Sequence, residues 1–296
     1  MGKEICLIVD SSGGIPEGIM EKYGIIEVPF YFKFEDTDYS KENIDYDPNF
    51  FFKKMEKDPK DIPKTAAPNP HDWITAFKKA YGKGCRKLIV TTISSKLSTS
   101  YQTAMSAKQL FEEEEDDVDI KVIDSKTCAT GQAVFEIWIG KMIKAGVEYD
   151  EILNRIEKRI PDVNTVFVVE SLKYMNEGGR IGGAATFLSK IINIKPISEF
   201  IDGEVHVIKP IIGRKKSLES IVDIVASRIK DKGKALLIVQ HARSKSDADF
   251  LHDYLREETG GRVKIYRSEL GITVGAHSGP GTVGIGLLEY EDDIPL

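Results

Sequence analysis

The 296 residues predict an α/β protein of two domains, a Rossmann-like N-terminal domain with a parallel sheet and a C-terminal α/β domain with a mixed sheet. Short apolar runs alternate with amphipathic stretches in the first half, as strands do when helices cover a parallel sheet. Pro161 ends the last of these stretches, so we expect domains at residues 1–163 and 164–296. Beyond it, Asp202 and Gly203 separate two apolar runs and predict a hairpin, which brings antiparallel pairing into the second sheet.

In the first domain, strands are predicted where apolar runs are short, and helices where apolar residues recur every three or four positions. The strands fall at residues 5–9, 25–34, 87–92 and 120–123. The helices fall at residues 16–23, 71–81, 98–114, 130–145 and 149–160. Because parallel sheets bind ligands beyond the carboxyl ends of their strands, we expect a site on the loops that follow these strands.

The second domain is expected to mix strands and helices in a less regular order. A strand at residues 165–170 comes first, and the hairpin pairs residues 194–201 with 205–211. The chain then continues as helix 218–230, strand 235–241, helix 245–258, strand 263–267 and a last strand at 283–290. This order predicts a sheet with helices packed against it.

Composition and charge exclude several classes of function. The formal net charge is −6 and the charges are spread along the chain, which argues against nucleic acid as a partner, because phosphate binding needs a basic face. No apolar run reaches the length of about 18 residues that a membrane span needs. The N-terminus lacks the pattern of a signal peptide. We therefore expect a cytoplasmic protein with no membrane span.

The three cysteines, Cys6, Cys85 and Cys128, lie far apart in sequence and lack metal-ligand spacing, so no metal site is expected. Their odd number and wide separation indicate a reducing compartment. Cys6 and Cys85 adjoin strand-like runs, where a small buried thiol is the usual occupant.

The most informative segment is residues 271–284, in which five glycines surround a single histidine, His277. Glycine is used where the backbone takes a positive φ or approaches another group closely. Two interpretations remain open at this point. The segment either approaches a ligand through His277 or is a Gly-rich turn that joins two strands.

A second polar cluster lies at residues 91–102, where hydroxyl side chains, among them Ser95 and Ser98, follow a strand and begin a helix. A helix N-terminus with added hydroxyls is a favourable seat for an anion such as a carboxylate. Thr65 is held in a defined direction by the rigid connection around Pro68 and Pro70. Uncharged donors of this kind, together with an imidazole, bind a carboxylate without burying a permanent charge.

The polar loop at residues 10–14, Asp-Ser-Ser-Gly-Gly, follows the first strand. It matches no nucleotide-binding motif, so we expect loop hydrogen bonds and helix capping there, and no nucleotide cofactor. An acyl hydrolase or transferase that uses Ser95 and His277 stays open as an alternative, although no G-x-S-x-G motif is present. Arg180, among four glycines, and Arg214, before a predicted helix, are candidates for contact with a phosphate or a partner protein.

Together these motifs resemble the DegV family of bacterial lipid-binding proteins over essentially the whole chain. The segments that carry the resemblance are residues 9–12, 65–68, 93–102, 122–125, 178–181, 194–197 and 275–281. The sequence departs from the family pattern in having Ala66, Ala67 and Thr99, changes that leave the expected carboxylate donors in place.

The resemblance implies a protein that is not itself an enzyme and that holds one long-chain fatty acid, such as palmitate, stearate or oleate, in a tunnel between its domains. It implies that Thr65, Ser95 or Ser98, and His277 surround the carboxylate. It also implies a partner, a separate ATP-dependent fatty-acid kinase of phospholipid metabolism that phosphorylates the bound acid. Arg180 and Arg214 match positions associated with the kinase or with the transferred phosphate.

Overall fold

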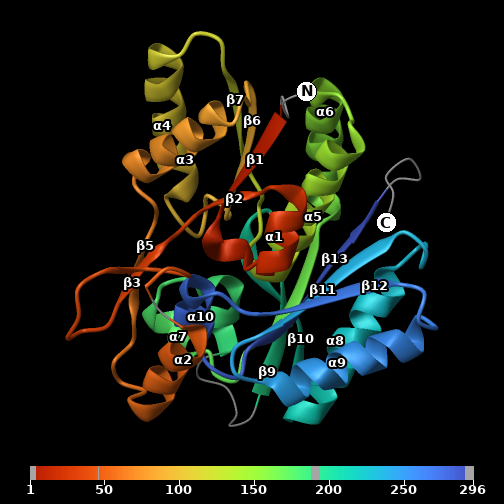
Figure 1. The fold of residues 1–296 in the computed structure, drawn as a ribbon. Coiled ribbons are helices and arrows are strands. Elements are labelled where there is room, and N and C mark those ends of the chain that lie inside the picture. The colour runs from red at the N-terminus through yellow and green to blue at the C-terminus, as the bar shows by residue number, and fades with distance from the viewer. Residues whose placement is uncertain (1–4, 46, 188–193, 291–296) are drawn as a thin grey trace.

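The computed structural model describes residues 5–45, 47–187 and 194–290, and it confirms the predicted α/β architecture (Figure 1). Four parallel strands form the first sheet in the order β2-β1-β6-β7. Their bounds are β1 Ile5–Asp10, β2 Ile26–Val28, β6 Lys87–Thr92 and β7 Asp119–Asp124. The interior of this sheet is apolar on both faces, as the uninterrupted apolar runs of β1 and β6 predict.

Helices cover both faces of the first sheet. Those of the first half are α1 Glu17–Tyr23, α3 Pro70–Gly82, α4 Ser100–Glu114, α5 Ala129–Ala145 and α6 Tyr149–Arg159. Helix α3 begins with a capping box, in which Asn69 and Asp72 satisfy each other's backbone N–H groups. Its apolar face packs with that of α4 over β1 and β6, around the rings of Trp73, Phe77 and Phe111.

The second sheet has six strands in the order β10-β9-β8-β13-β11-β12. Their bounds are β8 Asn164–Val168, β9 Ile194–Ile201, β10 Glu204–Ile212, β11 Ala235–His241, β12 Lys264–Glu269 and β13 Val283–Glu289. The predicted β9–β10 hairpin is present, and both turn residues, Asp202 and Gly203, have the positive φ that a type I′ turn requires. Only β11 and β12 run parallel, so the sheet is mixed as predicted.

Helices α8 Arg214–Arg228 and α9 Lys245–Glu258 pack on one face of the second sheet. The opposite face receives α5, which therefore lies between the two sheets. Fourteen of the residues of α5 are buried. Its side chains Phe135 and Trp138 share one core with Leu7 of β1 and Ile238 of β11. The boundary predicted at residue 163 falls between α6 and β8, and it stays a prediction.

A third, smaller sheet was not predicted. It has the order β4-β3-β5, with β3 Tyr31–Lys33, β4 Ser40–Lys41 and β5 Lys64–Ala66, and α2 Pro48–Lys57 packs against it. The single strand predicted at residues 25–34 is wrong, because Pro29 interrupts it. Residues before Pro29 pair in the first sheet and residues after it pair in the small sheet.

The Gly-rich segment contains a short helix, α10 Ile272–Ser278, so the interpretation as a plain turn between two strands is wrong. A side chain at Gly275 would overlap the Phe52 ring of α2, which shows why this position carries glycine. Helix α7 Lys173–Glu177 also packs against α10. Figure 1 shows α2, α7 and α10 close together. Three short 3₁₀ segments complete the description: Ser11–Gly13, Ile160–Asp162 and Gly182–Phe187.

The cysteines differ from expectation. Cys6 and Cys85 form a disulfide, with their Cα atoms 5.8 Å apart. Cys6 lies in β1 and Cys85 lies two residues before the neighbouring strand β6, so the sheet brings together two residues that are 79 positions apart in sequence. The expectation that both are free thiols is therefore wrong. Cys128 is free and buried.

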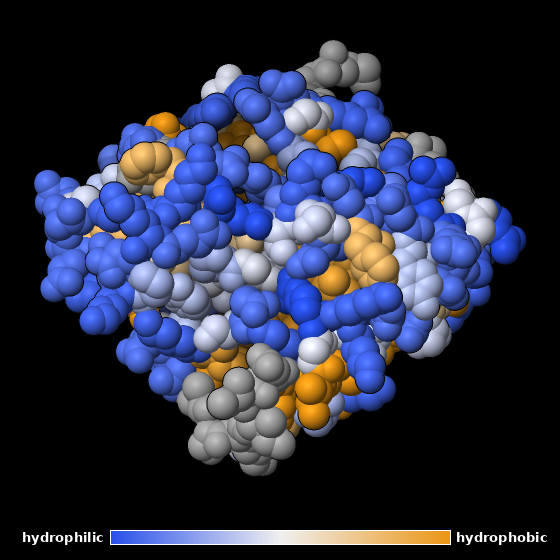
Figure 2. All heavy atoms as spheres, turned by 90° about the horizontal axis from the view of Figure 1, so that it is seen from below, coloured by the Kyte–Doolittle hydropathy of each residue, from blue (hydrophilic) through white to orange (hydrophobic). Residues whose placement is uncertain are grey.

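The apolar side chains are largely inside the molecule. On the face seen from below in Figure 1, the surface is mostly hydrophilic, with apolar side chains gathered in small patches (Figure 2). Among the described residues, none of the helices combines the length and the apolar character that crossing a bilayer requires.

Candidate functional site

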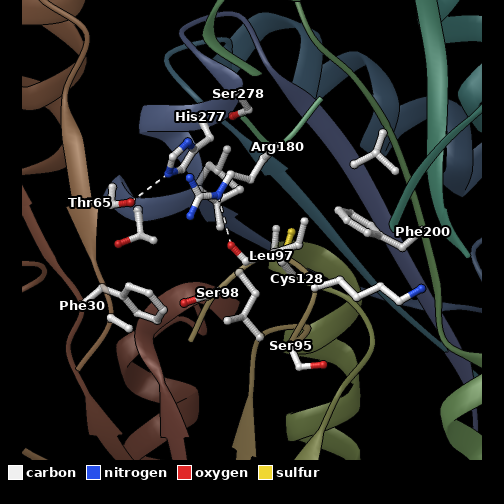
Figure 3. Close-up of a pocket in the computed structure, with 18 of the residues that line it drawn as sticks. Phe30, Thr65, Ser95, Leu97, Ser98, Cys128, Arg180, Phe200, His277 and Ser278 are labelled. Atoms are coloured by element: carbon white, nitrogen blue, oxygen red, sulfur yellow. Dashed lines mark hydrogen bonds between the residues drawn. The ribbon is translucent and has the colours of Figure 1, made fainter. Parts of the chain in front are cut away.

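A cavity of about 610 Å³ lies where the loop after β6, the start of α5, the small sheet, α10 and the second sheet meet (Figure 3). Its size falls in the range of small-molecule sites. The apolar part of the wall includes Phe30, Ile93, Leu97, Phe167, Phe200 and Val205. The site therefore offers an apolar interior at the carboxyl ends of the parallel strands, where ligands of such sheets bind.

Thr65 and His277 meet at one side of this cavity, although they are 212 positions apart in sequence. Thr65 lies in β5 of the small sheet and His277 in the last turn of α10. The distance between Thr65 Oγ1 and His277 Nε2 is 2.8 Å, a hydrogen bond drawn as a dashed line in Figure 3. The two predicted residues are thus one polar unit on the wall of an apolar cavity.

His277 is neutral in this environment. Burial lowers the pKa of His277 to about 4, and the positive charge of Arg180 nearby adds to the effect. Gly178 lies against the imidazole, and a side chain at that position would overlap Nδ1. Nδ1 has no hydrogen-bond partner within the described ranges. Among the described residues, the Thr65 hydroxyl is therefore the only hydrogen-bond partner of the imidazole.

Arg180 reaches across the cavity toward the loop after β6. Its Nε donates to the carbonyl of Leu97 at 3.1 Å, and its Nη1 donates to the carbonyl of Gly178 at 2.6 Å. Nη2 has no partner among the residues that the structure describes. The guanidinium is exposed, so it places a positive charge with a free donor at the solvent side of the Thr65–His277 pair.

The two serines of the polar cluster have different surroundings, although both line the cavity. The Ser95 hydroxyl donates to Asp124 at 2.5 Å, and Ser95 points away from His277 in Figure 3. The hydroxyl oxygen of Ser98 accepts the backbone N–H of Ser100 at 3.2 Å, which leaves its own proton free to donate. Helix α4 starts at Ser100, two residues later than predicted.

Hydrogen bonds to Asp10, a fully buried carboxylate at the end of β1, fix the loop that carries Ser98. Asp10 accepts the backbone N–H of Ile93 at 2.9 Å and the hydroxyl of Ser100 at 2.7 Å. The amide of Gln132, in α5, donates to the same carboxylate at 2.9 Å. Burial raises the pKa of Asp10, and these hydrogen bonds oppose that rise.

Arg214 is not on the wall of the cavity. It starts α8, and its guanidinium forms an ion pair with Asp247 at 2.7 Å and donates to the carbonyl of Gly281 at 2.6 Å. The structure thus brings Thr65, Ser98, Arg180 and His277 to one cavity, with Ser95 on its wall, and places Arg214 elsewhere.

Several wall residues could not be found from the sequence. Phe167 in β8 and Phe200 in β9 stack with ring centroids 5.6 Å apart, and Gly284 in β13 lies beside Phe167 and leaves room in the wall. No motif distinguishes these residues from other core positions. Cys128 also lines the cavity, and burial raises the pKa of its thiol to about 12, so it contributes an apolar surface.

The geometry limits the chemistry that the site can perform. Ser95 and His277 form hydrogen bonds with other residues, Asp124 and Thr65, and not with each other. A nucleophile and its general base need such a mutual hydrogen bond. In the part of the chain that the structure describes, no three His, Cys, Asp or Glu residues gather as metal ligands would.

Comparison with known proteins gives one consistent answer. The DegV family model, described as an uncharacterised protein family, matches residues 4–290. A DegV domain-containing protein of Clostridium perfringens is 30% identical over 279 residues, which are 94% of this chain and 96% of that protein. The fold is similar to that of a stearic acid-binding protein from Eubacterium ventriosum, with a TM-score of 0.90, 25% identity and 98% of both chains covered.

It is also similar to a DegV lipid-binding protein from Thermotoga maritima, with a TM-score of 0.84, 25% identity, 97% of this chain covered and 100% of that one. Because they cover 97–98% of this chain, these matches include strands of all three sheets. The chain belongs to the DegV family.

Proposed function

We propose that this protein binds one long-chain fatty acid, with the acyl chain in the cavity and the carboxylate at Thr65, Ser98 and His277. The observation that carries the proposal is the pairing of Thr65 with His277 on the wall of a cavity whose surface is mainly apolar. A ligand that fits it has a long apolar part and one anionic end. The stearic acid-binding protein of Eubacterium ventriosum, which shares the fold, supports this ligand class.

The head group is recognised through the Thr65 hydroxyl. When the neutral imidazole of His277 carries its proton on Nε2, it donates to Thr65 Oγ1, and the Thr65 proton is then free to point at the carboxylate. In the other tautomer, Nε2 accepts the Thr65 proton, and Thr65 would then present only the lone pairs of its oxygen to the carboxylate. Binding of an acid therefore selects the Nε2–H tautomer. Ser98 supplies the second hydroxyl, because the proton of Ser95 is used by Asp124.

The apolar interior provides most of the affinity. About 15 methylenes at about 0.8 kcal/mol each give a gross gain of about 12 kcal/mol on burial. Ordering of the chain and loss of its free motion cost several kcal/mol of this gain. A carbon or oxygen atom of the acid, with its hydrogens, is taken to occupy about as much space as a water molecule, about 30 Å³. The cavity of about 610 Å³ then holds roughly 20 such atoms. A single C16–C18 acid is consistent with that space.

The bound acid is presented to a separate ATP-dependent kinase, which transfers the γ-phosphate of ATP to a carboxylate oxygen and releases ADP. This step is supported by the family resemblance and by the absence of a nucleotide-binding motif in the sequence. Arg180 is the arginine that we assign to the phosphate, because its free Nη2 lies at the mouth beside His277. A contact of Arg214 with the kinase stays a prediction. We expect the protein to act as a cytoplasmic carrier and not as an enzyme on its own.

Mass spectrometry of organic extracts from the purified protein tests the binding proposal. We expect about one long-chain fatty acid for each chain. In Gly284→Leu, the new side chain enters the wall next to Phe167, and we expect the extracted acid to fall strongly. Gly18→Leu, in open space on α1, serves as the control and should retain the acid. Extracts without acid from the parent protein, together with no binding of added acid, would contradict the proposal.

The kinase step has its own test. The loaded protein is incubated with ATP and a purified bacterial fatty-acid kinase, and acyl phosphate is trapped with hydroxylamine. We expect acyl hydroxamate only when all three are present, and a lower yield with Arg180→Ala although the acid stays bound. Release of free acid from an activated ester by the protein alone would instead support the hydrolase alternative with Ser95 and His277.

A further inference from the structure

The loop that follows β4 carries a fully buried carboxylate that no step of the proposed function uses. Glu42 is 0% exposed. Its Oε1 accepts the backbone N–H of Thr273 at 3.0 Å, and its Oε2 accepts the Thr273 hydroxyl at 2.6 Å. Its Oε2 also accepts the hydroxyl of Ser11 at 2.7 Å. Burial of a carboxylate is costly unless such hydrogen bonds satisfy it, so this arrangement requires a reason.

We propose that Glu42 is a positioning residue, whose carboxylate fixes α10 in the register that places His277 beside Thr65. The inference rests on the proposed function and concerns how its head-group site is built. It also explains the polar loop after β1, which matches no nucleotide motif, because Ser11 of that loop is one of the donors to Glu42.

The small sheet touches α10 at two points one helical turn apart. Thr273 and His277 are four residues apart, which is about 6 Å along a helix and puts them on the same face. Glu42 directly follows β4 and holds Thr273, while Thr65 in β5 holds His277. Two contacts on one face fix both the rotation and the axial position of a helix, which a single contact cannot do.

The anchor of Glu42 is itself tied to the first sheet. The backbone N–H of Glu42 donates to the carbonyl of Phe30 at 2.9 Å, and the N–H of Phe30 donates to Ser11 Oγ at 3.0 Å. Ser11 directly follows the last residue of β1. The carboxylate therefore connects three parts of the fold, namely β1, the small sheet and α10, at the position where the cavity lies between them.

Gly271 provides independent geometric support. This residue precedes α10, and a Cβ atom built there would lie 2.6 Å from Glu42 Oε1. Glycine is the residue that lets the carboxylate reach the first turn of the helix. One of the five glycines that mark the segment in the sequence is therefore explained by Glu42.

The tolerance of the site is small. The Thr65–His277 hydrogen bond is 2.8 Å long, and such bonds weaken beyond about 3.2 Å, so a shift of α10 of well under 1 Å is enough to weaken it. Without the pair, the free acid loses a charge-assisted hydrogen bond that is worth roughly tenfold or more in affinity. The methyl ester of the same acid has no charge at the carboxyl group, so its affinity changes less.

The test measures the preference for the free acid over its methyl ester, as the ratio of the two Kd values, on delipidated protein. Glu42→Ala removes the anchor, and Gly271→Ala displaces the carboxylate while keeping it in the chain. We expect the preference to fall about tenfold in both variants. Glu42→Gln should retain it, because its amide can donate to the hydroxyls of Ser11 and Thr273 and its carbonyl can accept the N–H of Thr273. Val225→Ala, a core truncation in α8, controls for lost stability.

A second readout follows His277 directly. In ¹⁵N spectra of the histidines, assigned with His277→Gln, the imidazole of the parent protein should titrate with a midpoint near pH 4. In Glu42→Ala and Gly271→Ala, it should titrate nearer the ordinary value of 6.5, because the displaced ring meets more water. If Glu42→Ala does not fold, Gly271→Ala carries both measurements.

The outcomes separate this inference from the function on which it rests. An unchanged preference and an unchanged His277 titration in a folded Glu42→Ala or Gly271→Ala would overturn the positioning role. So would a loss in Glu42→Gln equal to that in Glu42→Ala. If the parent protein itself does not prefer the acid, the proposed function fails, and the His277 titration alone then decides whether Glu42 positions α10.

Discussion

Replacement of Thr65 by Val is the sharpest test of how the head group is held. Valine has the shape of threonine and a high β-propensity, so β5 and the small sheet should remain intact. The change removes the hydroxyl that forms a hydrogen bond with His277 and that we propose as a donor to the carboxylate. We expect the acyl chain to remain buried, because no other wall residue changes.

The size of the effect follows from the two kinds of hydrogen bond. A bond to a charged group is worth about 1.5–3 kcal/mol, which is roughly 10- to 100-fold in Kd for the free acid. A bond to the neutral carbonyl of the methyl ester is worth about 1 kcal/mol, or roughly fivefold. Both losses are small beside the gross gain of about 12 kcal/mol from the tail. The variant should therefore bind both ligands and discriminate poorly between them.

Isothermal titration calorimetry of delipidated protein with stearate and methyl stearate gives the two Kd values. Thr75→Val, at an exposed position in α3 whose hydroxyl donates to the carbonyl of His71, is the matched control. Equal losses for acid and ester would show that Thr65 acts on the cavity as a whole. An unchanged Kd for the acid would remove Thr65 from the site.

Three further predictions concern other residues. Ser98→Ala should weaken binding of the free acid about tenfold, whereas Ser95→Ala should leave its Kd nearly unchanged, since only Ser98 has a free proton; the opposite order would reassign the second donor. For His277, the folded pKa of about 4 lies below the ordinary 6.5, so the unfolded chain binds more protons between these values and stability falls as pH drops through this range. The free energy of unfolding in urea, measured against pH for the parent protein and for His277→Gln, should show this loss only in the parent protein. The loss should be at most about 3 kcal/mol, because solvent reaches part of the ring and reduces the effect. Parallel pH profiles of the two proteins would refute the prediction. A thiol reagent should count one free cysteine in the unfolded, unreduced protein and three after reduction, and a count of three before reduction would show that Cys6 and Cys85 are unbonded.

The sequence predicted the regular elements well where local pattern decides them. Strands such as Lys87–Thr92 and Ala235–His241 and the helix Lys245–Glu258 have the predicted bounds, because each is a clear apolar run or an amphipathic repeat. The errors occurred where tertiary contacts decide. Pro29 divides one apolar run between two sheets, and a Gly-rich stretch becomes α10 because Phe52 and other partners pack against it.

Part of the candidate site could also be predicted from local pattern. Thr65, His277 and Arg180 stand out because rigid or Gly-rich surroundings are unusual at ordinary surface positions. The choice between Ser95 and Ser98 depends on Asp124, whose position relative to the loop comes only from the pairing of β6 with β7. Phe167 and Phe200 resemble ordinary core residues in sequence, and only the assembled fold places them on the wall of the cavity. Glu42 resembles an ordinary surface residue in sequence, and only the fold shows that it is buried and bonded to Ser11 and Thr273.

The position of α5 has a consequence for dissection of the protein. Because this helix contributes Phe135 and Trp138 to a core shared with Leu7 and Ile238, a cut near residue 163 would leave one fragment with an uncovered apolar helix and the other with a bare sheet face. Each fragment produced separately should aggregate, whereas coexpressed fragments should copurify. We therefore expect the two halves that the chain order suggests to unfold as one cooperative unit.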